Sequence, residues 1–581
     1  MAERSGGDII ADVLARRGVR FLFTLCGGHI SPILVSAKRR GVRIVDVRDE
    51  KNAVFAADAT ARMTGTTGVA AVTAGPGVTN TLTAIKNAQM AESPLVLFGG
   101  ATPTMLKGRG ALQDIEQLAL MRPLTKGAAS LKTLAELEPA VERAFQLAQS
   151  GVPGPVFLEI PVDLLYPEAI VREWYMKEVQ GAKGLAGRAM RLYVRGHLYR
   201  QFHAPRLPLD LPTDLDIPRF GQERVIAEAA KKLREAKRPV LVIGSQALVN
   251  VRDTTPLVHA IERLGVPTYL GGMARGLLGR HHPLQLRHNR GKALKEADHV
   301  IIAGFPFDFR LGYGRSIARK ATLVAANLSP TSLRKNRKPD LGVVMHAGTF
   351  LESLAAQAAD VGVAYAPWFE TLRAREQERD TEIATQAKTA PPEGQVNPLH
   401  FFLKLEEHLA DDAVLVVDGG DFVATASYVL RPRGPLSWLD PGVFGTLGVG
   451  GGFAVGAALC SEGREVWLIY GDGSSAYSLS EMDTCVRHGL APIAVIGNDG
   501  AWAQIAREQV EILGDDVGTV LRRADYHVVG EGYGAVGLLC TDPAKIDETL
   551  AAAKAHAKAG RPVVINLHIA ATAFRKGSIS M

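Results

Sequence analysis

Gly471-Asp472-Gly473-Ser474 and, 27 residues after that aspartate, Asn498-Asp499 decide the fold predicted for this chain. The first stretch follows residues 465–470, an apolar run with the length and composition of a buried strand. Its glycines turn the chain sharply and let backbone N–H groups approach an anion. A helical pattern comes next, and residues 493–496 predict a second strand that ends at Asn498-Asp499.

Two strand ends therefore bring Asp472 and Asp499 to one edge of a parallel sheet, where open α/β sheets bind their ligands. Two carboxylates and a nearby backbone carbonyl suit Mg²⁺, which also takes phosphate oxygens as ligands. A glycine turn alone is weak evidence, because such turns are more often hairpins than metal sites. The fixed spacing of two strand ends makes the prediction of a magnesium–phosphate site specific.

This arrangement resembles the diphosphate-binding motif of thiamine-diphosphate enzymes, a Gly-Asp-Gly turn followed at this spacing by two asparagines. The resemblance implies thiamine diphosphate and Mg²⁺ as cofactors. It assigns the metal to Asp472, Asp499 and the backbone of Ala501, and the diphosphate to Gly471, Gly473 and Ser474. The chain departs from the family at Asp499, where a carboxylate replaces the second asparagine, so the metal would meet two carboxylates rather than one.

Strands and helices alternate over residues 1–165, and the same alternation returns over 223–360 and 397–581. Alternation of this kind predicts an α/β protein with three doubly wound parallel-sheet domains. The resemblance implies the order of the parts: a pyrimidine-binding domain (1–165), a linker with a basic amphipathic segment (166–222), a central α/β domain (223–360), a charged linker (361–396), and a diphosphate-binding domain with a C-terminal tail (397–581).

The first domain resembles the family's pyrimidine-binding domain in three motifs: a strand end and Ala-rich helix at 48–62, a Gly-Pro-Gly loop at 74–80, and Leu112-Gln113 in place of a Phe-Gln pair. The resemblance implies that Glu50 contacts N1′ of the aminopyrimidine, with which a carboxyl group can share a proton. The resemblance also implies that Gly75 lies in a loop that contacts the cofactor. The alternative is that Glu50 is a surface residue at a strand end.

His29 and Gln113 are the polar side chains expected near the reacting carbons. An imidazole titrates near pH 6.5, so His29 could relay a proton. A structural His29, bonded to a backbone carbonyl, is the other interpretation.

The third domain adds Gly420 and Asp421, which follow its first strand, as cofactor contacts. By position in the family pattern, Leu447 is the apolar residue that bends the cofactor, and Gly445 supplies a carbonyl to its 4′-amino group. An ordinary core leucine is the alternative for Leu447.

The composition is that of a globular protein, with 581 residues, 47% hydrophobic and 22% charged, which corresponds to about three or four domains. The net charge of +7 suits an anionic substrate such as a phosphate or CoA ester. The sequence contains no block of Lys and Arg residues of the kind that would predict a nucleic-acid partner. Four scattered cysteines without CxxC spacing, no signal-peptide pattern and no long uncharged apolar run lead us to expect a cytoplasmic protein.

Residues 187–203 interleave arginines with leucines and aromatic residues. Two interpretations fit this pattern: a basic amphipathic helix that lies on an anionic membrane surface, or a helix that packs on its own protein and keeps a solvated basic face. The second is preferred from the sequence, and membrane contact stays as the alternative.

Finer features, such as Phe-Gly-Thr-Leu-Gly at 444–448 and the tail at 574–580, resemble the 2-hydroxyacyl-CoA lyase branch of the family and oxalyl-CoA decarboxylase. They imply an acyl-CoA substrate that is cleaved to an aldehyde and formyl-CoA. General features also fit acetolactate synthase, which joins 2-oxoacids and is the alternative interpretation. A non-catalytic protein of the same fold is a third interpretation, against which Glu50 and Asp472 argue.

The family resemblance also bears on assembly and on the central domain. It implies a homodimer or homotetramer, in which the Glu50 domain and the Asp472 domain face each other across a subunit boundary. Central domains of the family bind FAD, the ADP part of CoA, or nothing, and this sequence leaves that choice open.

Overall fold

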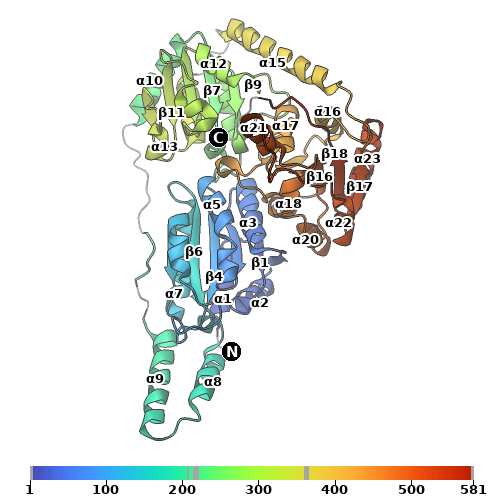
Figure 1. Ribbon diagram of the computed structural model, residues 1–581. Helices are drawn as coiled ribbons and strands as arrows, with labels where there is room; N and C mark the ends of the chain where they lie inside the picture. The colour runs from blue at the N-terminus through green and yellow to red at the C-terminus, as the bar shows by residue number, and fades with distance from the viewer. Residues whose placement is uncertain (1–3, 206–207, 213–221, 359–364, 577–581) are drawn as a thin grey trace. The chain divides into compact units, whose positions relative to one another are not determined.

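The computed structural model describes residues 4–205, 208–212, 222–358 and 365–576. The chain falls into two compact units, Met1–Ala61 with Thr66–Leu215 and Arg62–Gly65 with Asp216–Met581. Two parts of the linker expected at 166–222, residues 206–207 and 213–221, and the end of the tail at 577–581 lie outside the described residues. Three six-stranded sheets, each parallel throughout, confirm the predicted α/β class (Figure 1).

The first unit contains one sheet, with the strand order β2-β1-β3-β4-β6-β5. Its strands are β1 (Phe21–Leu25), β2 (Arg43–Asp46), β3 (Gly68–Val72), β4 (Leu95–Ala101), β5 (Gly127–Ser130) and β6 (Pro155–Pro161). Its helices are α1 (Gly6–Arg16), α2 (Ser31–Arg39), α3 (Glu50–Thr64), α4 (Pro76–Thr79), α5 (Leu82–Met90), α6 (Gln117–Met121), α7 (Leu134–Gln149), α8 (Glu168–Val179) and α9 (Gly184–His203). The strand order reverses between β1 and β3, and ligands bind at such switch points in open sheets.

The second unit contains two sheets, and the first of them has the order β12-β11-β10-β7-β8-β9. Its strands are β7 (Pro239–Ile243), β8 (Thr268–Leu270), β9 (Gln285–Leu286), β10 (His299–Ala303), β11 (Thr322–Ala326) and β12 (Leu341–Val343). Its helices are α10 (Gln222–Glu235), α11 (Thr255–Leu264), α12 (Arg290–Glu296), α13 (Pro330–Arg334) and α14 (Ala347–Ala358), followed by the charged helix α15 (Ala366–Ala387). In chain order this is the 3-2-1-4-5-6 arrangement of dinucleotide-binding sheets.

The last sheet has the order β14-β13-β15-β16-β18-β17, the same pattern as the first sheet. Its strands are β13 (Val414–Val417), β14 (Trp438–Leu439), β15 (Val466–Gly471), β16 (Ile493–Asn498), β17 (Val536–Cys540) and β18 (Val563–His568). Its helices are α16 (Pro398–His408), α17 (Asp421–Val429), α18 (Gly450–Cys460), α19 (Asp472–Ser475), α20 (Glu481–His488), α21 (Ala503–Leu513), α22 (Tyr526–Gly532) and α23 (Ile546–Lys558). The switch point lies between β13 and β15, so the turn at Asp472 lies beside it.

The central strands of all three sheets are buried on both faces, which is why they are continuous apolar runs rather than alternating ones. The helices that cover them have one apolar side; α10 buries Ile226, Ala229, Ala230 and Leu233 at helical spacing. Two-sided burial fixes each strand end in place and thereby fixes the loops that carry the candidate site. Among the described helices, none combines the length and hydropathy needed to cross a membrane.

Candidate active site

Glu50 is the first residue of α3 and its side chain is buried, with 7% of the residue exposed. This excludes the interpretation of a surface residue and corrects its expected place, because it begins a helix rather than ending a strand. The amide of Asn80, which follows α4, donates a hydrogen bond of 3.0 Å to Glu50 Oε2. Asn80 was not predicted as a partner of Glu50, since nothing in the local pattern links two residues thirty positions apart.

The Gly-Pro-Gly loop passes close to Glu50. Gly75 has φ +61°, a conformation that favours glycine, and a Cβ there would lie 2.9 Å from Cβ of Gln113. The Gly75 N–H donates to Gln117 Oε1 at 2.9 Å, so α6 fixes the loop. The structure thus brings Glu50, Gly75 and Gln113 together at one end of the first sheet, and Gln117 is a supporting residue that the sequence did not reveal.

His29 follows β1 and its ring lies beside the end of β3. Its Nδ1 is 3.2 Å from the hydroxyl of Thr73, and burial lowers the pKa of the imidazole below its usual value. The partner is therefore a side-chain hydroxyl, not the backbone carbonyl of the structural interpretation. A neutral ring at neutral pH can accept or donate one proton through its second nitrogen.

In the second unit, Asp472 ties the two predicted strand ends together. Its Oδ1 accepts from Gly473 N–H at 2.8 Å, and its Oδ2 accepts from Gly500 N–H at 2.9 Å. Asp499 accepts from Ala501 N–H at 3.2 Å within the same loop. The residues predicted to bind the metal thus lie on two adjoining loops at the end of β15 and β16.

Both carboxyl groups lie in a poorly solvated place. Burial raises the pKa of Asp472, while burial and the neighbouring charge of Asp472 raise the pKa of Asp499 to about 7. Two such groups favour a cation between them. Within the described residues, no three or more His, Cys, Asp or Glu side chains are arranged so that they could hold a metal ion by themselves, so a cation here would also need backbone or phosphate oxygens.

A cavity of about 600 Å³ opens beside these loops. The predicted cofactor contacts in this unit all line it: Gly420, Asp421, Gly445, Leu447, Gly471, Asp472, Gly473, Ser474, Asp499 and Ala501. Leu447 is half-buried at the cavity wall, which argues against an ordinary core leucine. Position 473 requires glycine, because a Cβ there would lie 2.4 Å from the ring of Trp502.

Asp418, at the end of β13, was not predicted as part of this site. It is buried and accepts hydrogen bonds from Gly448 N–H at 2.9 Å and Gly450 N–H at 2.6 Å. Burial raises its pKa to about 7 despite these bonds. Asp418 therefore fixes the loop that carries Gly445 and Leu447 to the switch point.

Asp421 begins α17 at the cavity wall and attracts two arginines. Arg507 of α21 forms an ion pair with its carboxylate, and Arg575 of the tail lies 3.6 Å away. Arg507 also donates to the carbonyl of Arg575 at 2.8 Å. The described part of the tail is thereby folded onto the rim of the cavity, close to the predicted cofactor contact.

A second cavity of about 340 Å³ adjoins the first, and Arg275, Ala424, Ser427 and Arg575 line both. Arg287, which follows β9, and Arg290, which begins α12, extend the basic lining. Burial lowers the pKa of Arg275 and Arg290, and lowers that of Arg287 to about 10. No ion pair joins Arg275, Arg287 or Arg290 to an acid within the described residues. Each guanidinium group donates to a backbone carbonyl, and poorly solvated guanidinium groups that lack an ion-pair partner favour a bound anion.

Comparison with known protein families identifies the family to which this chain belongs. Residues 4–120 match the model described as thiamine pyrophosphate enzyme, N-terminal TPP binding domain. Residues 226–354 match the central domain, and 418–567 match the C-terminal TPP binding domain. The chain belongs to the thiamine pyrophosphate enzyme family. The resemblance predicted from the sequence is confirmed.

Among the relatives of this family member is 2-hydroxyacyl-CoA lyase 2 of Danio rerio, 48% identical over 100% of this chain and 94% of that protein. The Homo sapiens protein of the same name is 48% identical over 100% of this chain and 92% of its own length. A probable acetolactate synthase of Mycobacterium bovis is 32% identical over 97% of this chain and 95% of that protein.

The residues present fit thiamine diphosphate, the cofactor of the family. Gly420 and Gly445 have φ of +115° and +65°, and a Cβ at either would meet no atom within 4 Å, so open backbone borders the cavity. The raised pKa values of Asp472 and Asp499 show two carboxyl groups that a cation would stabilise in their charged form. Each unit holds one part of the predicted set, Glu50 in the first and Asp472 in the second.

Proposed function

We propose that this enzyme is a thiamine diphosphate-dependent lyase that cleaves a 2-hydroxyacyl-CoA to formyl-CoA and an aldehyde one carbon shorter. The observation that carries the proposal is the arginine-lined cavity adjoining the cofactor cavity. Similarity to 2-hydroxyacyl-CoA lyase 2 over the whole chain supports the same substrate class.

The chain's own residues would hold the cofactor as follows. Asp472, Asp499 and the backbone of Ala501 would bind Mg²⁺, and the turn at Gly473 and Ser474 would face the diphosphate. Leu447 would support the bent cofactor and Glu50 its aminopyrimidine. Bound thiamine diphosphate would supply a nucleophilic carbanion for the thioester carbonyl and a positively charged ring that accepts the electrons of the broken carbon–carbon bond.

In the lyase reaction the bond between C1 and C2 of the acyl group breaks. The 2-hydroxyl loses its proton and becomes the aldehyde oxygen, and C1 gains a proton to become formyl-CoA. Glu50 would exchange a proton with the aminopyrimidine ring, since its carboxyl group is buried and oriented by Asn80. His29 and Gln113 are the proposed proton-handling and orienting side chains for the substrate, because both lie at the switch point of the first sheet.

The arginines give the substrate a handle far from the reacting carbons. CoA carries a diphosphate and a 3′-phosphate, and guanidinium groups bind phosphate oxygens in pairs. Binding energy from this remote part can position the short acyl end for attack. Pyruvate has no such group, which favours the lyase over acetolactate synthesis, the second candidate suggested by the Mycobacterium bovis relative.

Arg290→Gln tests this assignment. We expect KM for a 2-hydroxyacyl-CoA to rise about ten- to a hundred-fold, since one charged hydrogen bond to phosphate is lost. KM for the corresponding pantetheine thioester, which lacks the nucleotide phosphates, should change less than about two-fold. Arg315→Gln, an exposed arginine of the same region, serves as the control and should leave both values unchanged. Equal increases for both thioesters would show that Arg290 supports the fold rather than CoA.

We further propose that the active form contains at least two chains, each contributing one part of every site. Inactive Glu50→Gln and Asp472→Ala variants should then regain activity when their subunits are exchanged. With equal mixing, random pairing restores one intact site in half of the dimers, about a quarter of wild-type activity. Activity that stays at the level of the separate variants, with subunit exchange verified by native mass spectrometry, would mean that each chain forms its own site.

A further inference from the structure

The hairpin of α8 and α9 extends away from the sheet of the first unit (Figure 1). Its inner side is well packed: Val171, Val179, Val194 and Leu198 are buried together. Polar contacts fix it to its own unit, because Tyr175 donates to Asp163 at 2.6 Å and the His197 ring lies 2.7 Å from the Thr104 hydroxyl. The hairpin is therefore a fixed projection rather than a loose segment.

The outer side of α9 is apolar. Leu185, Leu192 and Tyr199 recur every seven residues, which places them on one side of the helix, opposite Val194 and Leu198. They are 83%, 71% and 65% exposed. The helix packs on its own unit and keeps exposed arginines, as preferred from the sequence, and its outer face also carries large apolar side chains.

Basic residues flank this apolar side. Arg188 and Arg195 lie along one margin and Arg200 along the other, and α9 contains no Asp or Glu. Across residues 168–203 there are seven Lys and Arg side chains and three Glu side chains. One of the three, Glu168, is already paired with Arg172 and His203.

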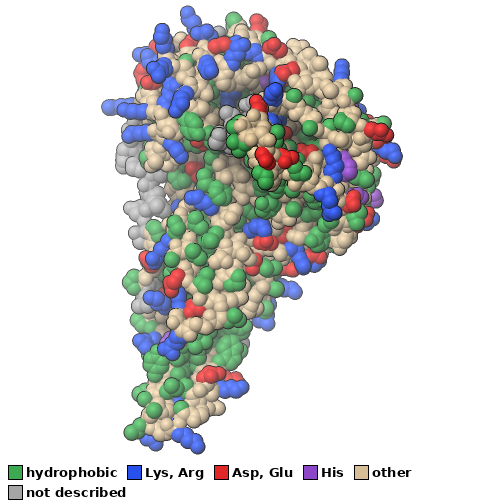
Figure 2. Space-filling view, viewed as in Figure 1, with side chains coloured by type: hydrophobic (Ala, Val, Ile, Leu, Met, Phe, Trp, Pro, Cys, Tyr) green, Lys and Arg blue, Asp and Glu red, His purple; other side chains and the backbone are tan. Residues whose placement is uncertain are grey.

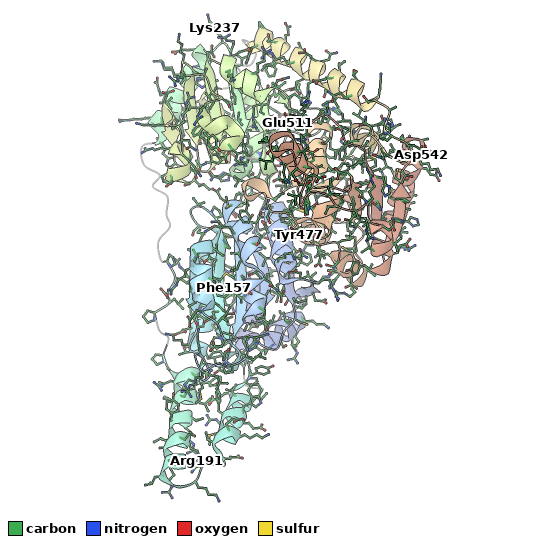
Figure 3. All side chains as sticks on the ribbon, in the orientation of Figure 1. Phe157, Arg191, Lys237, Tyr477, Glu511 and Asp542 are labelled. Atoms are coloured by element: carbon green, nitrogen blue, oxygen red, sulfur yellow. The ribbon has the colours of Figure 1, made fainter. Side chains whose placement is uncertain are left out.

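The end of the hairpin is also basic. Lys183, Arg188 and Arg191 line a shallow hollow at the turn between the helices. Figure 3 labels Arg191 near this end, and Figure 2 shows hydrophobic side chains over the hairpin with Lys and Arg side chains around its tip. On α8, Trp174 is half exposed next to Tyr166, and tryptophan suits the boundary between lipid and water.

We propose that α9 is a membrane-surface anchor that lies along a bilayer containing anionic lipids. Leu185, Leu192 and Tyr199 enter the boundary between headgroups and acyl chains, while the flanking arginines contact lipid phosphates. A helix of this length, 20 residues and about 30 Å, lies in the plane of the surface and does not cross it. The charge argues for an anionic membrane as the occupant, because a second copy would bring its own arginines to the same face.

Sedimentation of the holoenzyme with vesicles tests the proposal. We expect binding to vesicles of phosphatidylcholine with about one third phosphatidylserine, and little binding to phosphatidylcholine alone. Leu185→Ser with Leu192→Ser should raise the apparent dissociation constant at least about ten-fold. Lipids brominated on their acyl chains should quench tryptophan fluorescence in the wild type, and Trp174→Phe should remove most of that quenching.

Two matched variants separate the apolar and the charge contributions. Arg188→Gln with Arg195→Gln should weaken binding about ten-fold and reduce its salt dependence. Arg319→Gln with Lys320→Gln removes the same charge from another exposed surface and should leave binding unchanged.

Two outcomes would overturn the anchor. The first is wild-type protein that stays in the supernatant with anionic vesicles. The second is a smaller assembly in the Leu185 and Leu192 variant without vesicles, measured by sedimentation velocity, because the face would then be a contact between copies of this chain.

Discussion

Glu50→Gln should lower kcat for 2-hydroxyacyl-CoA cleavage by about two to four orders of magnitude, the range for loss of a positioned proton-transfer group. The amide has nearly the shape of the carboxyl group and can still accept the bond that Asn80 donates at 3.0 Å. It cannot exchange a proton with the aminopyrimidine. Cofactor affinity, measured by calorimetry, should change much less, because the predicted diphosphate contacts lie in the other unit.

Asp49→Asn is the matched control for this variant. Asp49 precedes α3 and accepts from Lys51 N–H at 3.0 Å, and asparagine serves equally well at such a position. The control removes a neighbouring negative charge but no buried carboxyl group, so kcat should stay within about two-fold. A Glu50→Gln enzyme with near-normal kcat would show that another group handles the ring proton.

Asp472→Ala should raise the dissociation constant for thiamine diphosphate with Mg²⁺ by about two orders of magnitude, because a charged ligand oxygen is lost. The same change removes the acceptor of Gly473 and Gly500 N–H, which weakens the link between the two loops. Asp472→Asn separates these effects, since an amide oxygen keeps one acceptor without the charge. We expect it to lose metal affinity while keeping the melting temperature close to that of the wild type.

Asp499→Asn is the informative companion, because it restores the asparagine that the family pattern has at this position. Asparagine keeps an oxygen ligand and can still accept from Ala501 N–H, so metal and cofactor binding should be largely retained. Calorimetric titration of all three variants gives the comparison. If Asp499→Asn abolishes binding while Asp472→Ala does not, the two ligand roles are assigned the wrong way round.

Much of the fold could be predicted because the strands are apolar on both faces. Residues 465–470 and 493–496 were predicted as strands and correspond to β15 and β16. Short or edge strands such as β9 and β14, with two residues each, give no such pattern and were missed. Their place depends on pairing with a neighbour that lies elsewhere in the sequence.

The candidate site, like the fold, could be predicted only in part. Glu50 and Asp472 follow recognisable local patterns, whereas their supports come from distant segments: Asn80 for Glu50, and the loop at Gly500 for Asp472. No local pattern indicated that Arg275, Arg287 and Arg290 would line one cavity. Such a cluster exists only once the loops of one sheet pack against α17 of another. Tertiary contact, not local pattern, creates it.

The central claim is the lyase reaction itself, and direct detection of its products tests it most closely. Purified enzyme with thiamine diphosphate and Mg²⁺ would be incubated with 2-hydroxyacyl-CoA substrates of increasing chain length, and in parallel with pyruvate. Mass spectrometry would then follow formyl-CoA, the shortened aldehyde and acetolactate. We predict equal amounts of formyl-CoA and aldehyde from at least one thioester, dependent on thiamine diphosphate, and little acetolactate. Efficient condensation of pyruvate with every 2-hydroxyacyl-CoA left intact would contradict the account.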